Sequence, residues 1–155
     1  MNYLGIDSST QAIHCVLIDD KERLISTQKF FSKGKKTLDR FPEMMIGFFD
    51  FISTINNISV VAIEDSIQAR NGVTTKTLAR VVGGVHTCCV LSGIETVLIH
   101  LATWKKEVIG RGNATKSDIL EFAIEKWGNK FPEQDYADAA CVALWNKRRS
   151  NGEKC

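Results

Sequence analysis

The segment NYLGIDSSTQAIHCVLI, residues 2–18, decides the fold of this chain. Two apolar runs, 2–7 and 12–18, flank four small polar residues of the kind that make turns, so the segment predicts a β-hairpin. A polar turn at 19–22 and a further run at 23–31 predict a third strand, antiparallel to the second. The first strand of this sheet ends in a carboxylate, Asp7.

The pattern then changes to helices that alternate with strands. Apolar residues from Phe41 to Ile52 recur at steps of three and four, which is typical of an amphipathic helix. The run 60–64 predicts a strand buried on both faces. We expect the remaining elements to be a helix at 74–91 capped by Thr74 or Thr75, a strand at 97–99, a loop at 100–114, and helices at 115–127 and 134–149. This order predicts an α/β fold with a mixed five-stranded sheet, its first three strands antiparallel, flanked by helices.

Length and composition indicate one globular domain, residues 1–155. The 44% hydrophobic and 25% charged content excludes a disordered or fibrous chain. The N-terminus lacks the pattern of a signal peptide, and no apolar stretch is long enough to cross a bilayer. The five cysteines contain no C-x-x-C pair, so we expect small core residues in a reducing cytoplasm. The three histidines are separated in sequence and are expected to be structural.

Carboxylates stand at positions where a charge is costly. Asp7 and Glu64 each end an apolar strand, where a buried charge must be paired, protonated or bound to a cation. Asp135 and Asp138 lie one turn apart at the start of a helix, on the same face. Taken alone, Asp135 is expected to be a first-turn acid stabilised by the helix dipole. The small residues that follow Asp138 would let this helix lie close to the sheet.

These four acids form an oxygen-only set. Hard cations such as Mg²⁺ and Mn²⁺ prefer oxygen ligands. If the four side chains converge, they can hold two ions about 3.5–4 Å apart, the arrangement that cleaves phosphodiesters. Spacing alone leaves their convergence open.

Four motifs resemble those of the RuvC family of Holliday junction resolvases. They are Gly5-Ile6-Asp7, Ala62-Ile63-Glu64, the stretch from Trp104 to Lys116, and Asp135-Tyr136-Ala137-Asp138-Ala139-Ala140. Their order and separations match the family over nearly the whole chain. The resemblance implies an RNase H-like fold, a homodimer, and paired magnesium-dependent nicking of four-way DNA junctions, with Mn²⁺ able to substitute and no nucleotide cofactor.

By position, the resemblance makes Asp7, Glu64, Asp135 and Asp138 the ligands of two Mg²⁺ ions. Lys116, with Lys105 or Lys106, matches basic residues near the scissile phosphate. Two departures stand out. Ser8-Ser9-Thr10 replaces a frequent Pro-Gly after the first aspartate, and Ile67 occupies the position of a phenylalanine that stacks at the junction centre. The pattern suits a divergent or phage-type member, with an altered sequence preference.

Basic residues occur in clusters that are candidates for DNA contact. The strongest candidate contains Lys105, Lys106, Arg111 and Lys116 beside a glycine-rich segment, and a second contains Arg70, Lys76 and Arg80. Two further clusters lie at 33–40 and 147–149. For any single cluster, a solvated surface is an equally good interpretation. Phosphate contacts by such residues would be strongly salt-dependent and indifferent to sequence.

Two further features leave alternatives open. Gly83 and Gly84 lie inside a predicted helix, where glycine costs about 1 kcal/mol relative to alanine, so the helix packs closely either on its own sheet or on a second copy. Trp104, Trp127 and Trp145 are expected to be core or rim residues, and base stacking is an alternative for Trp104 because it precedes two lysines.

Three other functions compete with junction resolution. Residues 4–11 also resemble the first phosphate-binding loop of actin-like ATPases and sugar kinases, although the chain is short for such an enzyme. A non-catalytic junction binder would have little reason to keep four acids. A nuclease with broader specificity, for forks or RNA–DNA hybrids, stays open. The formal charge of +2 does not argue against DNA: setting aside four of the 18 acids leaves 14 against 20 basic residues, or +6 on the remainder.

Overall fold

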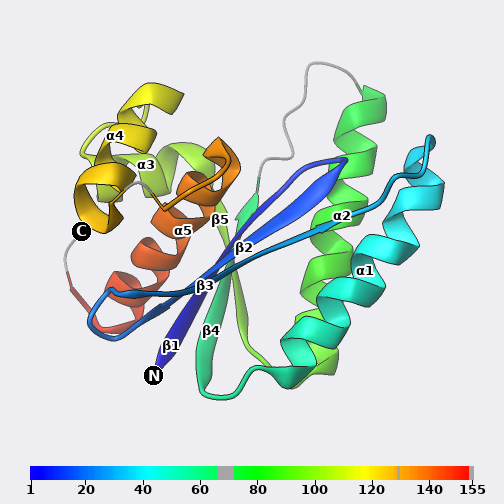
Figure 1. Ribbon diagram of the computed structural model, residues 1–155, viewed down its shortest axis with the longest axis horizontal. Helices are drawn as coiled ribbons and strands as arrows, with labels where there is room; N and C mark the ends of the chain where they lie inside the picture. Colours follow the sequence, from blue (N-terminus) through cyan, green and yellow to red (C-terminus); the bar gives the residue numbers. More distant parts are fainter. Residues whose placement is uncertain (66–71, 129, 154–155) are drawn as a thin grey trace.

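The computed structural model describes residues 1–65, 72–128 and 130–153 (Figure 1). In chain order the elements are β1 (Asn2–Ser8), β2 (Ala12–Asp19), β3 (Leu24–Phe31), α1 (Thr37–Thr54), β4 (Ile58–Asp65), α2 (Gly72–Leu91), β5 (Thr96–His100), α3 (Leu101–Ile109), α4 (Lys116–Trp127) and α5 (Gln134–Ser150). Within these ranges, no helix is long and apolar enough to cross a membrane.

The five strands form one mixed sheet in the order β3-β2-β1-β4-β5. β1 lies in the middle, where it pairs antiparallel with β2 and parallel with β4. β3 pairs antiparallel with β2 at one edge, and β5 pairs parallel with β4 at the other. The predicted mixed five-stranded sheet is confirmed; its spatial order adds that β4 lies beside β1, which the linear sequence does not indicate.

Helices cover both faces of the sheet, and each side has its own core (Figure 1). On one face, α1 and α2 pack through residues such as Met44, Phe48 and Val85 against Leu4 and Ile6 of β1. On the other face, α3, α4 and α5 form a second apolar cluster with the sheet. Because side chains alternate along a strand, β1 directs Leu4 and Ile6 to the first core and leaves the intervening residues for α5.

α5 lies very close to the central strand. A Cβ built at Gly5 would overlap backbone atoms of Ala139 and Ala143, so this approach requires glycine in β1 and small residues in α5. Asn146 is fully buried and donates its amide Nδ2 to the backbone oxygens of Val60 (2.7 Å) and Leu4 (3.3 Å), which ties the helix to β4 and β1. The predicted close packing of this helix is confirmed.

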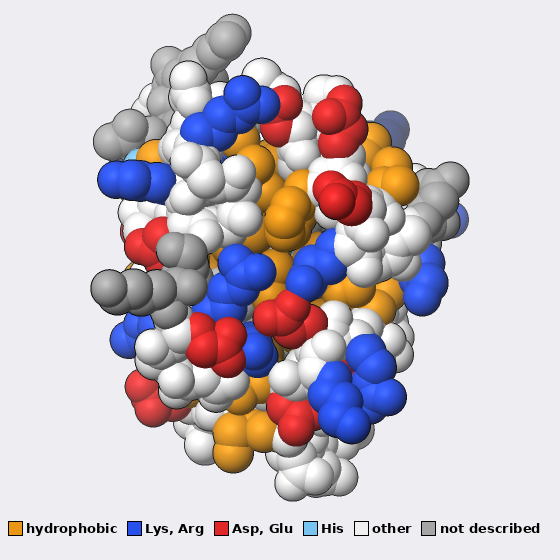
Figure 2. Space-filling view, turned by 90° about the vertical axis from the view of Figure 1, so that its left-hand side faces the viewer, with side chains coloured by type: hydrophobic (Ala, Val, Ile, Leu, Met, Phe, Trp, Pro, Cys, Tyr) orange, Lys and Arg blue, Asp and Glu red, His pale blue; other side chains and the backbone are white. Residues whose placement is uncertain are grey.

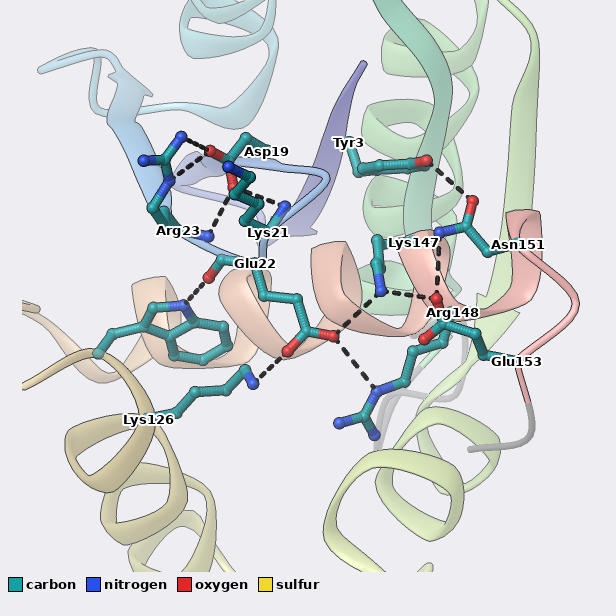
Figure 3. Close-up of polar contacts among 11 residues, drawn as sticks. Tyr3, Asp19, Lys21, Glu22, Arg23, Lys126, Lys147, Arg148, Asn151 and Glu153 are labelled. Atoms are coloured by element: carbon teal, nitrogen blue, oxygen red, sulfur yellow. Dashed lines mark hydrogen bonds and ion pairs between the residues drawn. The ribbon is translucent and has the colours of Figure 1, made fainter.

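Glu22, in the turn between β2 and β3, joins the C-terminal half of α5 to α4 (Figure 3). Its carboxylate pairs with Lys126 of α4 and lies 3.4 Å from Nζ of Lys147 and 3.9 Å from Nε of Arg148. Its backbone oxygen accepts a hydrogen bond from Nε1 of Trp127 at 2.8 Å. These contacts link three elements that are far apart in sequence.

One helix was missed by the sequence analysis, and the start of another was placed too late. The segment 100–114 was expected to be a loop, but α3 occupies Leu101–Ile109: His100 caps its N-terminus and Gly110, at φ 95°, ends it. The helix expected to begin at Thr74 or Thr75 already includes Gly72.

The glycine pair in α2 resolves into two environments. A Cβ at Gly84 would overlap the side chains of Met45 and Phe41, so this glycine serves contact with α1 of the same chain. Gly83 is exposed, with nothing within 4 Å of a Cβ placed there. Helix packing therefore explains Gly84 and leaves Gly83 available for other contacts. The four cysteines in the described residues are free and buried, as predicted, and Cys155 lies outside those residues.

Candidate active site

Three polar side chains form a row across the central strands, on the face that α5 covers. In the parallel β1–β4 pair, Ile6 is opposite Ile63. The residues that follow, Asp7 and Glu64, therefore lie side by side at the C-terminal ends of these two central strands. In the antiparallel β1–β2 pair, Asp7 is directly opposite His14. Directly opposed residues share a face of the sheet. His14, Asp7 and Glu64 therefore form a row in space, in that order, on β2, β1 and β4.

α5 adds two more carboxylates over this row. Asp135 is in its first turn and half-buried, and Asp138 follows one turn later and is buried. Ligand atoms of Asp7, His14 and Asp135 all lie within 4.8 Å of one another, close enough to share a cation; among the described residues this is the group of three that meets that condition. The predicted neighbourhood of four acids is present, and a histidine expected to be structural lies within it.

Electrostatics confirm that the four acids act on one another. Burial raises the pKa of Asp7 well above its usual range, and the charges of Glu64, Asp138 and Asp135 add to that increase. Burial, followed by the charge of Glu64, raises the pKa of Asp138 from 3.8 to about 7. Lys116 opposes both shifts. Burial and the neighbouring negative charges therefore both favour the protonated forms of Asp7 and Asp138.

Trp104 orients Glu64. Its indole is fully buried in the core and donates Nε1–H to Oε2 of Glu64 at 2.8 Å. The burial of the ring agrees with the interpretation of Trp104 as a core residue and leaves no exposed ring face for base stacking. The tryptophan instead positions a carboxylate of the cluster, a role that the sequence did not indicate because the two residues are 40 positions apart.

His14 is 2% exposed and lies at the other end of the row. Its Nε2 is 3.2 Å from Oε2 of Glu133, and that carboxylate also accepts two hydrogen bonds from Lys29. The imidazole packs edge-on against the ring of Tyr136, with centroids 4.9 Å apart. Sequence reasoning missed this position of His14, because symmetric pairing about the predicted turn at 8–11 places Ala12, not His14, opposite Asp7, whereas the observed register places His14 there.

Among the predicted basic residues, two from the strongest cluster are near the acids. Lys116, at the start of α4, has Nζ 3.8 Å from Oδ1 of Asp135 and is 76% exposed. Lys105 lowers the pKa of Asp138 through its charge, and its Nζ also donates to the backbone oxygen of Ala114. Two lysine side chains, Lys116 and Lys105, therefore place positive charge next to the carboxylates.

The other predicted DNA-binding residues differ in their exposure and in their partners. Arg111 is paired with Asp118, its Nη2 lying 2.6 Å from Oδ1 of the carboxylate. Lys106, Lys76 and Arg80 are exposed, the last two on α2. Arg70 and Ile67 lie outside the described residues.

A hollow of about 410 Å³ adjoins the acids on the side of β2 and β3. Asp135 and His14 form one wall, and Lys29, Lys33 and Arg40 contribute positive charge to its lining. This hollow could accommodate a nucleic-acid backbone next to the carboxylates. By contrast, the face made by α3, α4 and α5 mixes basic and acidic side chains around apolar ones (Figure 2), with Lys126 and Arg148 paired to Glu22.

The turn after Asp7 is closed by a serine. Oγ of Ser9 accepts hydrogen bonds from the backbone N–H groups of Ala12 (3.1 Å) and Gln11 (3.2 Å). The hydroxyl therefore stabilises the turn between β1 and β2. Its use within the turn weakens the interpretation of residues 4–11 as a phosphate-binding loop.

Comparison with known proteins identifies the fold. No protein-family model and no curated protein matches the sequence. Among solved structures, RuvC of Thermus thermophilus superposes with a TM-score of 0.80 at 16% identity, covering 99% of this chain and 98% of that one. The same RuvC in complex with Holliday junction substrate gives 0.80 at 17% identity, with the same coverage. The yeast mitochondrial Holliday junction resolvase Ydc2 gives 0.58 at 14% identity, covering 95% of this chain and 79% of that one. The chain therefore has a RuvC-like, RNase H-like fold.

Proposed function

We propose that this chain is a structure-selective DNA endonuclease that resolves four-way junctions by metal-dependent phosphodiester hydrolysis. The observation that carries the proposal is the set of mutually interacting carboxylates at the edge of the central strands. The set lies on a fold shared with a RuvC that was solved in complex with Holliday junction substrate. Both the acids and the fold are consistent with the motif resemblance.

In this mechanism, Asp7, Glu64, Asp135 and Asp138 hold two Mg²⁺ ions, with Mn²⁺ as a substitute. The donor set fits, because it consists of carboxylates that repel one another and that burial makes costly to ionise. When bound, the two ions would activate a water and stabilise the leaving oxygen. Trp104 keeps Glu64 oriented toward them through its indole N–H.

Basic side chains supply the contacts to DNA. Lys116 is assigned to the scissile phosphate, because its side chain is 76% exposed and its Nζ lies beside the carboxylates, 3.8 Å from Oδ1 of Asp135. Lys105 adds charge at the same site. We assign Lys106, Arg111, Lys76 and Arg80 to contacts with the DNA backbone, and Arg70, which lies outside the described residues, stays a prediction for the same role.

We further propose that the protein acts as a homodimer. Two symmetrical nicks need two equivalent sites, which a two-fold dimer provides. α2 is a candidate for the contact, since it exposes Val73, Val90 and Leu91 and its Gly83 would allow close approach. Light scattering tests this point: a strictly monomeric protein that still makes paired nicks would contradict the dimer.

The test of function is incubation with labelled four-way, forked and duplex DNA, each with Mg²⁺ or with EDTA. We expect paired cleavage of the four-way junction, dependent on Mg²⁺. Asp7→Asn should abolish cleavage and leave junction binding intact. Asp20→Asn, an exposed aspartate that follows the far end of β2, is the matched control and should cleave normally.

Each alternative predicts a different result in the same assay. Binding of the junction without cleavage by the wild type would favour a non-catalytic binder. Equal cleavage of forks would favour a broader branched-DNA nuclease. Full cleavage by Asp7→Asn would refute the assignment of the carboxylates.

A further inference from the structure

The imidazole of His14 has one nitrogen that the fold leaves unused. Nδ1 is buried and has no hydrogen-bond partner among the described residues. Its nearest charged group is Oδ2 of Asp135, at 3.8 Å, which is too long for a hydrogen bond. A buried polar atom without a hydrogen-bond partner lowers the stability of a fold. The nitrogen therefore calls for a partner on the side of the ring where the carboxylates lie.

The other nitrogen determines what Nδ1 can do. Nε2 lies 3.2 Å from Glu133, and Lys29 holds that carboxylate in place with hydrogen bonds of 2.6 and 2.7 Å. A carboxylate accepts only, so Nε2 carries the proton and donates. In the neutral ring Nδ1 then carries the lone pair, on the side of the ring where Asp135 lies. A histidine that donates one nitrogen to a carboxylate while the other faces a cation site is the usual arrangement of metal-ligating histidines.

We propose that His14 is a metal ligand through Nδ1, so that one of the two cation positions is a mixed site of one imidazole and the carboxylates of Asp7 and Asp135. Ligand atoms of these three side chains already lie within 4.8 Å of one another. The strand register supports the assignment, because Asp7 and His14 are opposed across β1 and β2. The inference rests on the proposed metal-dependent function and specifies its metal site.

The nitrogen ligand changes which ion the site prefers. Mg²⁺ favours oxygen ligands, whereas imidazole favours transition ions, and Mn²⁺ accepts both. We therefore infer that His14 increases the preference for Mn²⁺ over Mg²⁺. Glu133 and Lys29 act as positioning residues, because they orient the ring without facing the cation position.

The direct test is pulsed electron paramagnetic resonance of the full-length protein with one equivalent of Mn²⁺ and no DNA. A bound imidazole gives a ¹⁴N modulation, which should change to the ¹⁵N pattern when the histidines alone are labelled with ¹⁵N. This version needs no substitution, so it does not depend on the folding of a variant. Mn²⁺ bound without histidine coupling would overturn the inference.

Variants then identify the residue. His14→Ala should lose the coupling, while His86→Ala and His100→Ala, which remove the other two histidines, should keep it. Glu133→Gln should also keep it, because an amide oxygen can accept from Nε2. By calorimetry, we expect His14→Ala to weaken Mn²⁺ binding by about tenfold or more and Mg²⁺ binding by a smaller factor. Coupling that survives in His14→Ala, or equal losses for the two ions, would refute the assignment.

These results are separable from those on function. Histidine coupling in a protein that cleaves no junction would leave the metal site standing and refute the nuclease. Junction cleavage in a protein whose bound Mn²⁺ shows no histidine coupling would leave the nuclease standing and refute the role of His14. Failure of Mn²⁺ to bind would refute both.

Discussion

Gly5→Ala is the most demanding test of how the acids are brought together. The added methyl would overlap backbone atoms of Ala139 and Ala143, and neither can move without moving α5 as a whole. Overpacking of a well-packed core costs about 1–3 kcal/mol. Because the obstacle is helix backbone rather than a flexible side chain, we expect a loss near the upper end, about 3 kcal/mol.

For a chain of this size, that loss corresponds to a decrease in Tm of about 6–12 °C. The displacement of α5 would also move Asp135 and Asp138 away from Asp7, so Mn²⁺ affinity should fall in molecules that remain folded. Urea titration and calorimetry measure the first effect, and binding of Mn²⁺ measures the second. Both should change together.

Two other glycines provide matched controls. Gly83→Ala adds a methyl to a position of α2 that has nothing near it within one copy of the chain, and should stabilise the isolated subunit by about 0.5–1 kcal/mol. Gly84→Ala would meet the side chains of Met45 and Phe41, which can adjust, so its effect should be intermediate. If Gly5→Ala unfolds at the same urea concentration as the wild type, the close contact between α5 and β1 does not limit the position of the acids.

Two further predictions concern the acids. Burial and the charge of Glu64 raise the pKa of Asp138 to about 7. The stability associated with its protonated form is therefore lost as pH rises from about 4 to 7, and the free energy of unfolding of the metal-free protein should fall across this range. Urea titrations of Asp138→Asn should show a flatter dependence of this free energy on pH. Parallel profiles would contradict the assigned pKa. Trp104→Phe should cost about 1–3 kcal/mol by leaving the buried carboxylate of Glu64 without its indole donor. In a double-mutant cycle with Glu64→Ala, which removes the acceptor, additive losses would argue against that contact.

The candidate acids could be found in the sequence because each one follows a local pattern of apolar residues or helical spacing. A carboxylate at the end of an apolar strand is visible without any knowledge of the strand's neighbours, and this applies to Asp7 and Glu64. α3 was missed, although Leu101, Trp104 and Val108 have helical spacing, because Gly110 and the nearby lysines favoured a loop. Its end at Gly110 shows that the glycine terminates a helix there.

The contacts that orient the acids could not be predicted, because they join residues that are remote in sequence. His14 and Glu133 are 119 positions apart, and Trp104 and Glu64 are 40 apart. Neither pair has a local signature: a histidine within an apolar strand and a tryptophan within a short helix both suit an ordinary core. Only the strand register and the placement of α5 bring out their roles.

The β2–β3 hairpin contacts α5 at both ends, through Glu22 near its C-terminus and through His14 and Lys29 at Glu133, which precedes it. From Glu133 to Arg148 a helix rises about 22 Å. From His14 to Asp19, its last residue, β2 covers about 17 Å, and the turn that follows brings Glu22 to the C-terminal half of α5. The strand and its turn together therefore span the length of the helix. One residue inserted in β2 would shift the hairpin by about 3.3 Å against a helix that advances about 1.5 Å per residue. Insertions or deletions in either element should consequently persist only when the other changes length to compensate, whereas substitutions along the same stretch face no such constraint.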